Sequence, residues 1–96
     1  MSRGSYLRIL CYDITCNRRR RKVARILEDQ ATRVQYSVFE TRLTAKGIMN
    51  FAEEITAHLD DGDSLRVYTV GRTGERQCQV YGSGVPVETD AGYWLL

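Results

Sequence analysis

The segment YLRILCYDITCNRRRRKVARILED, residues 6–29, decides the fold because it joins two different hydrophobic periods. Residues 6–12 are dense in aliphatic and aromatic side chains that alternate between two faces, which is typical of a β-strand. From residue 18 onward the apolar positions recur at helical spacing, and arginines cover the opposite side. The segment therefore predicts a strand with Asp13 at its carboxyl end and an amphipathic helix over residues 18–31 with Asn17 as its N-cap.

The rest of the chain continues in the same manner. Residues 34–40, VQYSVFE, alternate in hydrophobicity and predict one strand. An amphipathic helix is expected at residues 44–59, with Thr44 as its N-cap. The remaining expected elements are a turn at residues 60–63, a strand at 64–70 and, after the hairpin-like GRTGER, a strand at 77–81.

A single α+β domain accounts for these elements. The 96 residues are enough for one core, and dimerisation would add useful burial. The order predicts a ferredoxin-like sandwich, an antiparallel sheet with two helices on one face. The other face is expected to bear Tyr12, Phe39 and Tyr68, and an exposed apolar face favours a face-to-face homodimer.

The C-terminal residues are set apart by their composition. Residues 1–81 are expected to form the ferredoxin-like domain, which would bind nucleic acid. Residues 82–96 read as a Gly-rich linker followed by the apolar YWLL. A tail this apolar is expected to dock, and the partner subunit's sheet edge is one place where it could do so.

Positive charge is concentrated in the first third of the chain. Residues 1–33 carry nine Lys or Arg against three acids, a net charge of +6, whereas the remaining residues sum to −4. A solvated helix face and a surface that contacts a polyanion both explain this asymmetry. Cations in the first turn of a helix oppose its macrodipole, and such local inconsistency favours function. The expected phosphate contacts in this run are Arg18, Arg19, Arg20, Arg21 and Lys22.

The cysteines and the histidine form no recognisable site. Cys11, Cys16 and Cys78 lack the spacing of a structural zinc site. His58 is expected to be a surface residue near the end of a helix, where it favours the dipole. No signal-peptide pattern and no apolar run of about 18 residues is present, so we expect a cytoplasmic chain with reduced thiols and no membrane segment.

Four segments together resemble the CRISPR-associated protein two family, small adaptation proteins known as CRISPR-associated endoribonucleases. They are YDI at the strand end, RRRRKVARILED, RVQYSVFE and SLRVYTV, and they span about residues 6–71. The resemblance implies a ferredoxin-like homodimer with an exchanged C-terminal strand and phosphodiesterase chemistry that depends on Mg²⁺ or Mn²⁺. It also implies DNA or RNA as ligand and the CRISPR integrase as partner during spacer acquisition.

The resemblance also assigns roles to individual residues. Asp13 matches the family's strand-end aspartate, which implies a catalytic, metal-binding residue near the dimer axis. Where many relatives carry further acids, residues 15–17 of this chain are Thr, Cys and Asn, so fewer oxygen ligands are present. The other matches are Tyr12 and Phe39 as supporting aromatics and Arg20, Lys22 and Arg33 as nucleic-acid contacts.

The chemistry at Asp13 can also be argued from the residue itself. Mg²⁺ commonly takes one or two carboxylates together with waters and phosphate, so one Asp13 per chain is too little. Two copies brought together by a two-fold axis would be enough. A bound metal would activate water and polarise the phosphate, while arginines stabilise the developing charge. The alternative is a strand-end residue that caps the following turn.

Three functions remain open on this evidence. The first is a dimeric CRISPR adaptation protein with a metal-dependent endonuclease site at Asp13. The second is a non-catalytic scaffold for integrase and DNA. The third is an unrelated ferredoxin-like binding module, although no RNP-type aromatic signature lies on a strand. Tyr36 and Phe39 are expected to be packing residues rather than base-stacking residues.

Overall fold

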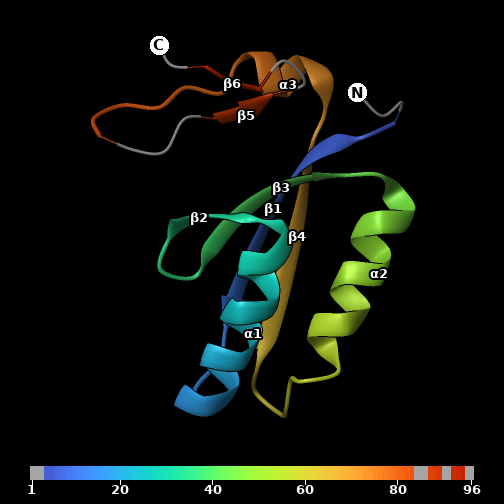
Figure 1. Ribbon diagram of the computed structural model, residues 1–96, viewed down its shortest axis with the longest axis vertical. Helices are drawn as coiled ribbons and strands as arrows, with labels where there is room; N and C mark the ends of the chain where they lie inside the picture. Colours follow the sequence, from blue (N-terminus) through green and yellow to red (C-terminus); the bar gives the residue numbers. More distant parts are fainter. Residues whose placement is uncertain (1–3, 84–86, 90–91, 95–96) are drawn as a thin grey trace.

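The computed structural model describes residues 4–83, 87–89 and 92–94. Four strands form one antiparallel sheet in the order β2-β3-β1-β4, and α1 and α2 lie side by side against it (Figure 1). The predicted α+β, ferredoxin-like architecture is confirmed. The elements in chain order are β1 (Tyr6–Asp13), α1 (Asn17–Gln30), β2 (Thr32–Gln35), β3 (Val38–Leu43), α2 (Ala45–Thr56), β4 (Ser64–Val70), α3 (Arg72–Arg76), β5 (Val87–Thr89) and β6 (Gly92–Trp94).

The core lies between the sheet and the two long helices. Leu10 of β1 and Phe39 of β3 are fully buried, and they pack with the helix residues Leu27 and Ile55. Full burial of a side chain of this size stabilises a fold by about 1.5–3 kcal/mol. The helices therefore stay on one face because their apolar stripes and this face of the sheet bury each other.

The helix ends differ in how their first turns are capped. The Thr44 hydroxyl accepts a hydrogen bond from the Gly47 N–H at 3.0 Å, so the predicted cap of α2 is confirmed. The predicted cap of α1 is wrong, because Cys16 is the N-cap and Asn17 is already helical. α1 therefore begins one residue earlier than the capping preference of Asn17 predicts, and the turn between β1 and α1 is one residue shorter.

The single strand predicted at residues 34–40 is in fact a hairpin. β2 ends at Gln35, Tyr36 and Ser37 form the turn, and β3 begins at Val38. The favoured two-residue hairpin turns need a positive φ, usually at Gly or Asn, and no described non-glycine residue has one. A register shift between Arg33 and Gln35 takes up the geometry instead. The alternation of VQYSVFE therefore continues through a turn that contains neither Gly, Pro nor Asn.

The strand predicted at residues 77–81 is also wrong. The hairpin-like GRTGER forms the short helix α3 instead of a turn, and residues 77–83 form no regular element. Glu75 of α3 pairs with Arg42 of β3, which holds this segment against the sheet. The alternation of QCQVY is therefore not used for strand pairing, although residues 79–81 line a cavity together with residues of β2 and β3.

Two of the three aromatic residues predicted on the exposed sheet face lie on the other face. Tyr12 and Phe39 are buried in the core under the helices, with exposed fractions of 6% and 0%. Tyr68 is 49% exposed and lies opposite Ile9, on the helix-free face, as predicted. Residues on one strand alternate between faces, but the pattern alone does not say which face the helices will cover.

The C-terminal part is described only in pieces. β5 and β6 pair antiparallel with each other, and β5 approaches β3. Residues 95–96 of the apolar YWLL lie outside the described residues, so docking of this segment on a partner subunit stays a prediction, as does the division at residue 81. Within the described ranges, no helix is long and apolar enough to span a membrane.

Candidate nucleic-acid interface

The start of α1 is held in place by the loop that follows α2. Arg19 donates from Nε to an Asp63 carboxylate oxygen at 2.9 Å, and its Nη1 lies 3.7 Å from Asp60. The Asp63 side chain is fully buried and also accepts the backbone N–H groups of Asp60 at 3.0 Å and Thr15 at 3.4 Å. Asp63 therefore joins the end of β1, the first turn of α1 and the loop before β4.

This network makes the stability of the fold depend on pH. The hydrogen bond from Arg19, followed by that from the Asp60 N–H, lowers the pKa of Asp63 below its ordinary value. A lowered folded-state pKa contributes stability above the unfolded-state pKa of about 3.9, and this contribution is lost as the pH falls through the folded-state value. Asp63 thus favours the native state at neutral pH and no longer does so in acid.

We therefore expect Asp63→Asn to lower the free energy of unfolding at pH 7, with the difference from wild type shrinking below about pH 4. Urea unfolding followed by circular dichroism at a series of pH values measures this difference. Asp61→Asn is the matched control, because Asp61 is exposed and its side chain makes no ion pair within the described residues. A difference that stays constant down to the acid range would contradict the prediction.

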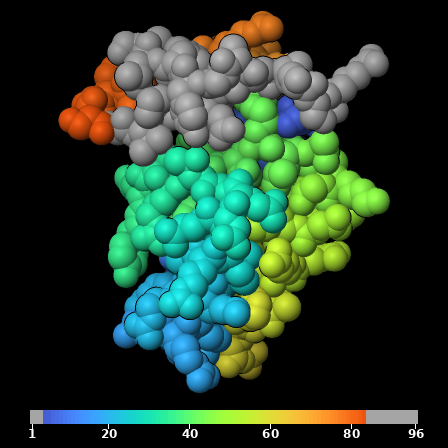
Figure 2. All heavy atoms as spheres, viewed as in Figure 1, coloured from blue at the N-terminus to red at the C-terminus, as the bar shows by residue number. Residues whose placement is uncertain are grey.

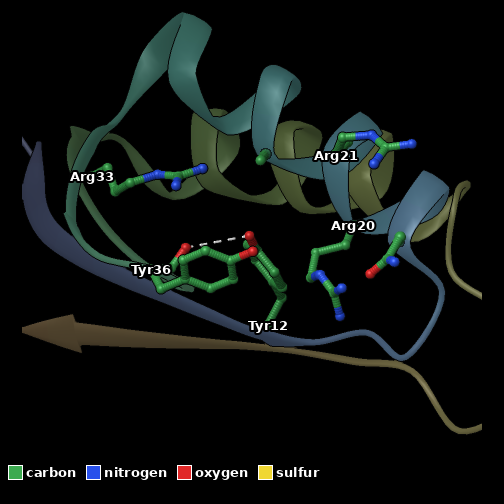
Figure 3. Close-up of a pocket in the computed structure, with 7 residues that line it drawn as sticks. Tyr12, Arg20, Arg21, Arg33 and Tyr36 are labelled. Atoms are coloured by element: carbon green, nitrogen blue, oxygen red, sulfur yellow. Dashed lines mark hydrogen bonds between the residues drawn. The ribbon is translucent and has the colours of Figure 1, made fainter.

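One face of α1 and the β2–β3 hairpin enclose a cavity of about 210 Å³. The Tyr12 hydroxyl donates to the Tyr36 carbonyl at 3.4 Å (Figure 3). Arg20 donates from Nη1 to the Ile14 carbonyl at 2.8 Å. The Arg33 guanidinium enters from the hairpin side and lies 5.1 Å from the centre of the Phe39 ring. The described residues that line the cavity are Tyr12, Asn17, Arg20, Arg21, Ala24, Arg33 and Tyr36.

The cavity is strongly cationic. Its described lining contains three arginines and no carboxylate. Among these arginines only Arg33 has an acidic partner within the described residues, Glu28 at 3.9 Å, and an exposed pair of this length contributes little. Burial raises the pKa of the Tyr12 phenol, with Arg33 acting in the opposite direction, so Tyr12 is a neutral hydroxyl at physiological pH. Such a wall is suited to an anion, because guanidinium groups bind phosphate with several donors at once.

The predicted basic run is divided between two sides of α1. Arg20 and Arg21 line the cavity at the hairpin, together with the predicted Arg33. The other predicted residues, Arg18, Arg19 and Lys22, border a separate cavity on the α2 side. Helical spacing explains the division, since positions 18 and 22 share one stripe and positions 17, 20, 21 and 24 another.

The sequence pattern missed three contributors to this region. Tyr36 is 71% exposed beside the cavity, so the expectation that it is a packing residue is wrong, whereas Phe39 does pack, in the core and not on the exposed face where it was predicted. Asp63 positions Arg19, although only the turn signal around it was visible in the sequence. His58 reaches the second cavity because the end of α2 lies beside the start of α1. The turn at Tyr36 and the pairing of two helix ends are both tertiary features.

Asp13 stands apart from the arginines. It is the last residue of β1, it lies opposite Ser64, and its side chain is exposed on the face that Tyr12 does not share. Within the described residues the Asp13 carboxylate accepts no hydrogen bond from the following turn, so the capping role is not observed; Asp63 bonds the Thr15 N–H there instead. No group of three potential metal-ligating side chains occurs in this described part of the chain.

The chain is similar in sequence to members of one protein family. The family model described as CRISPR associated protein Cas2 matches residues 6–78. A CRISPR-associated endoribonuclease Cas2 of Synechocystis is 38% identical over 78 residues, covering 78% of this chain and 83% of the relative. A CRISPR-associated endoribonuclease Cas2 of Chloroflexus aurantiacus is 32% identical over 89 residues, covering 92% and 95%.

Solved structures agree with the sequence matches. A hypothetical protein from Thermus thermophilus superimposes with a TM-score of 0.74 at 36% identity, covering 85% of this chain and 96% of that chain. Streptococcus pyogenes Cas2, crystallised at pH 6.5, superimposes with a TM-score of 0.67 at 29% identity, covering 79% and 99%. Fold, family model and relatives all lead to one assignment: this chain belongs to the CRISPR-associated protein Cas2 family.

Proposed function

We propose that this protein acts in CRISPR adaptation as a homodimer that grips nucleic acid with the start of α1 and carries a metal-dependent endonuclease site at Asp13. The observation that carries the binding half is the cavity at the hairpin, where Arg20, Arg21 and Arg33 converge without a carboxylate in the described lining. Fixed cations of this kind contact backbone phosphates and position a strand without reading its sequence.

The residues at the end of β1 fit a divalent ion only if two chains contribute. The Asp13 carboxylate is exposed and has no ion-pair partner within the described residues, so its oxygens are available to a hard cation. Two Asp13 side chains from a face-to-face dimer would hold Mg²⁺ or Mn²⁺. When bound, such an ion supplies an activated water and charge stabilisation at the phosphate.

The helix-free face of the sheet supports the dimer in this proposal. Ile9 and Cys11 are half-buried on this face, and Tyr68 is exposed beside them. Asp13 lies at the end of the same face, so stacking two such faces about a two-fold axis would bring the two carboxylates towards each other. The arginines around α1 remain on the outer surface of that dimer, where they would hold nucleic acid from the side.

Cleavage of RNA is the form of nuclease activity that the relatives favour, because they are named endoribonucleases. The walls of the α1 cavity offer guanidinium groups and a phenol hydroxyl, which bind phosphate in RNA and DNA alike. These groups therefore do not select the sugar. The proposal therefore covers cleavage of RNA or of DNA, and it also includes binding to the CRISPR integrase.

A non-catalytic scaffold is the second candidate, and one observation favours it. Within the described residues Asp13 belongs to no group of three potential metal-ligating side chains, and residues 15–17 add no acid. A protein of this kind would hold DNA for the CRISPR integrase while Asp13 serves only the dimer interface. Co-purification with the integrase subunit that is unchanged by Asp13→Asn, together with inactivity of the wild type with either ion, would support the scaffold.

The binding half predicts a specific loss on Arg21→Gln. Each phosphate contact contributes about 0.9 to the slope of log affinity against log salt, so removing one should lower the slope by about one unit. Fluorescence anisotropy of a labelled duplex measures Kd over a salt series from about 50 to 200 mM. Arg21 is exposed and makes no ion pair within the described residues, so the variant should fold normally.

Arg76→Gln is the matched control for that measurement. Arg76 is an exposed arginine of α3, at the end of the molecule opposite the first turn of α1 (Figure 1). The control should leave both Kd and the salt slope unchanged. If both variants lose the same affinity and salt slope, the effect comes from net charge alone, which would contradict the assigned interface. A wild type that binds no nucleic acid would overturn the proposed function.

A further inference from the structure

A second cavity, of about 300 Å³, lies between the start of α1 and the end of α2. The described residues that line it are Arg18, Arg19, Lys22 and His58, so each lining side chain carries nitrogen donors and none carries a carboxylate. Figure 2 shows the first turns of α1, in blue, bordering the segment that follows α2, in yellow. This cavity is on the other side of α1 from the one at the hairpin.

The charges around this cavity are not balanced. The carboxylates of Asp60 and Asp63 are both directed at Arg19. Arg18 and Lys22 are exposed and make no ion pair within the described residues. Like charges gathered without counter-charge repel one another, and this repulsion is relieved when an anion binds between them.

Part of the cavity wall, at Arg19 and at the backbone of His58, is held in place by other residues of the fold. The buried Asp63 carboxylate fixes the Arg19 guanidinium and the first turn of α1. His58 is half-buried, and its backbone N–H donates to the Ile55 carbonyl at 3.0 Å, which holds it at the end of α2. Donors that are positioned before binding lose less entropy when a ligand orders them.

We infer that this cavity is a second seat for a backbone phosphate of the bound nucleic acid, formed by Arg18, Lys22 and His58. The inference rests on the nucleic-acid binding proposed above and extends it. One protomer would contact the polymer on both sides of α1, at two separate places. His58, which the sequence indicates only as a surface residue near a helix end, becomes a binding residue because tertiary packing places it in the lining of the same cavity as Lys22.

One loss and one gain test this seat. Lys22→Gln should lower the salt slope of duplex binding by about one unit. The increase in Kd between 50 and 200 mM salt should therefore be about 3.5-fold smaller than in wild type. His58→Lys should raise the slope by a similar amount and tighten binding, because it adds a permanent cation facing the phosphate. A purely structural role of His58 would not produce a gain. Lys46→Gln, at an exposed lysine near the other end of α2, is the control and should change neither quantity.

The outcomes separate this inference from the function on which it rests. If wild type binds and Arg21→Gln lowers the slope, but Lys22→Gln and His58→Lys match the Lys46→Gln control, the second seat is overturned and the proposed interface stands. If wild type binds no duplex at any salt concentration, both are overturned. Thermal unfolding of each variant shows whether folding is intact, and the gain on His58→Lys requires a folded protein.

Discussion

Asp13→Asn is expected to reduce cleavage in the presence of Mg²⁺ or Mn²⁺ by at least about 100-fold, because the loss of a direct metal ligand should exceed the 10–100-fold cost of losing an outer-shell partner. The amide keeps the size of the side chain but removes the charge that a hard cation needs. Asp13 is exposed and has no ion-pair partner in the described chain, so the free energy of unfolding should change by less than about 0.5 kcal/mol.

The measurement is cleavage of labelled single-stranded RNA and duplex DNA by purified protein with each ion or with a chelator. Asp61→Asn, at an exposed aspartate of the loop before β4, is the control and should retain full activity. Duplex affinity of the Asp13 variant should stay within the error of wild type, since the arginine cavity lies on the other face of the sheet. Activity that survives Asp13→Asn would remove the nuclease assignment from this residue, and an inactive wild type would leave the scaffold function.

Phe39→Ala is expected to cost about 3–5 kcal/mol of stability, the usual range for removing a buried aromatic ring. Phe39 is fully buried in β3, its ring lies 6.3 Å from that of Tyr12, and the Arg33 guanidinium covers it. The substitution would leave a cavity between the sheet and both helices. It should also loosen Tyr12 and Arg33, so nucleic-acid binding should weaken along with stability.

Urea unfolding at fixed protein concentration measures this loss, and the concentration must be fixed because a dimer gains stability by mass action. Met49→Ala is the control, because Met49 is 58% exposed on α2 and its truncation should change stability by less than about 0.5 kcal/mol. Phe39→Leu should cost less than Phe39→Ala, since it refills part of the cavity. Equal stabilities of wild type and Phe39→Ala would contradict the core placement of this residue.

Most secondary structure could be predicted because its signals are local. β1 and β4 were visible from dense apolar alternation, and both long helices from apolar stripes at helical spacing. The β2–β3 hairpin was not visible, because its turn at Tyr36 and Ser37 contains neither Gly, Pro nor Asn. The helix α3 was also missed. The ion pair that holds it joins Glu75 to Arg42, and a local sequence pattern does not show a contact between residues so far apart in the chain.

The candidate site was predictable in its residue types and only partly in its arrangement. The basic run and Arg33 follow from composition and from the resemblance to the family. The separation of Arg20 and Arg21 from Arg18 and Lys22 depends on which helix face meets the hairpin and which meets the end of α2. Sequence spacing shows that the basic residues form two stripes on α1. Which element each stripe faces is set by tertiary packing.

The sequence by itself determined the family, the order of most elements and the accumulation of cations at the start of α1, because these depend on residue identity and short-range period. Only the tertiary structure decided that the helices cover the face of the sheet that bears Tyr12 and leave the face that bears Asp13 open. Alternation along a strand is symmetric between its two faces, and the difference appears only when the helices cover one of them. The Asp13 carboxylate and the arginine cavity are thereby separated by the thickness of the sheet.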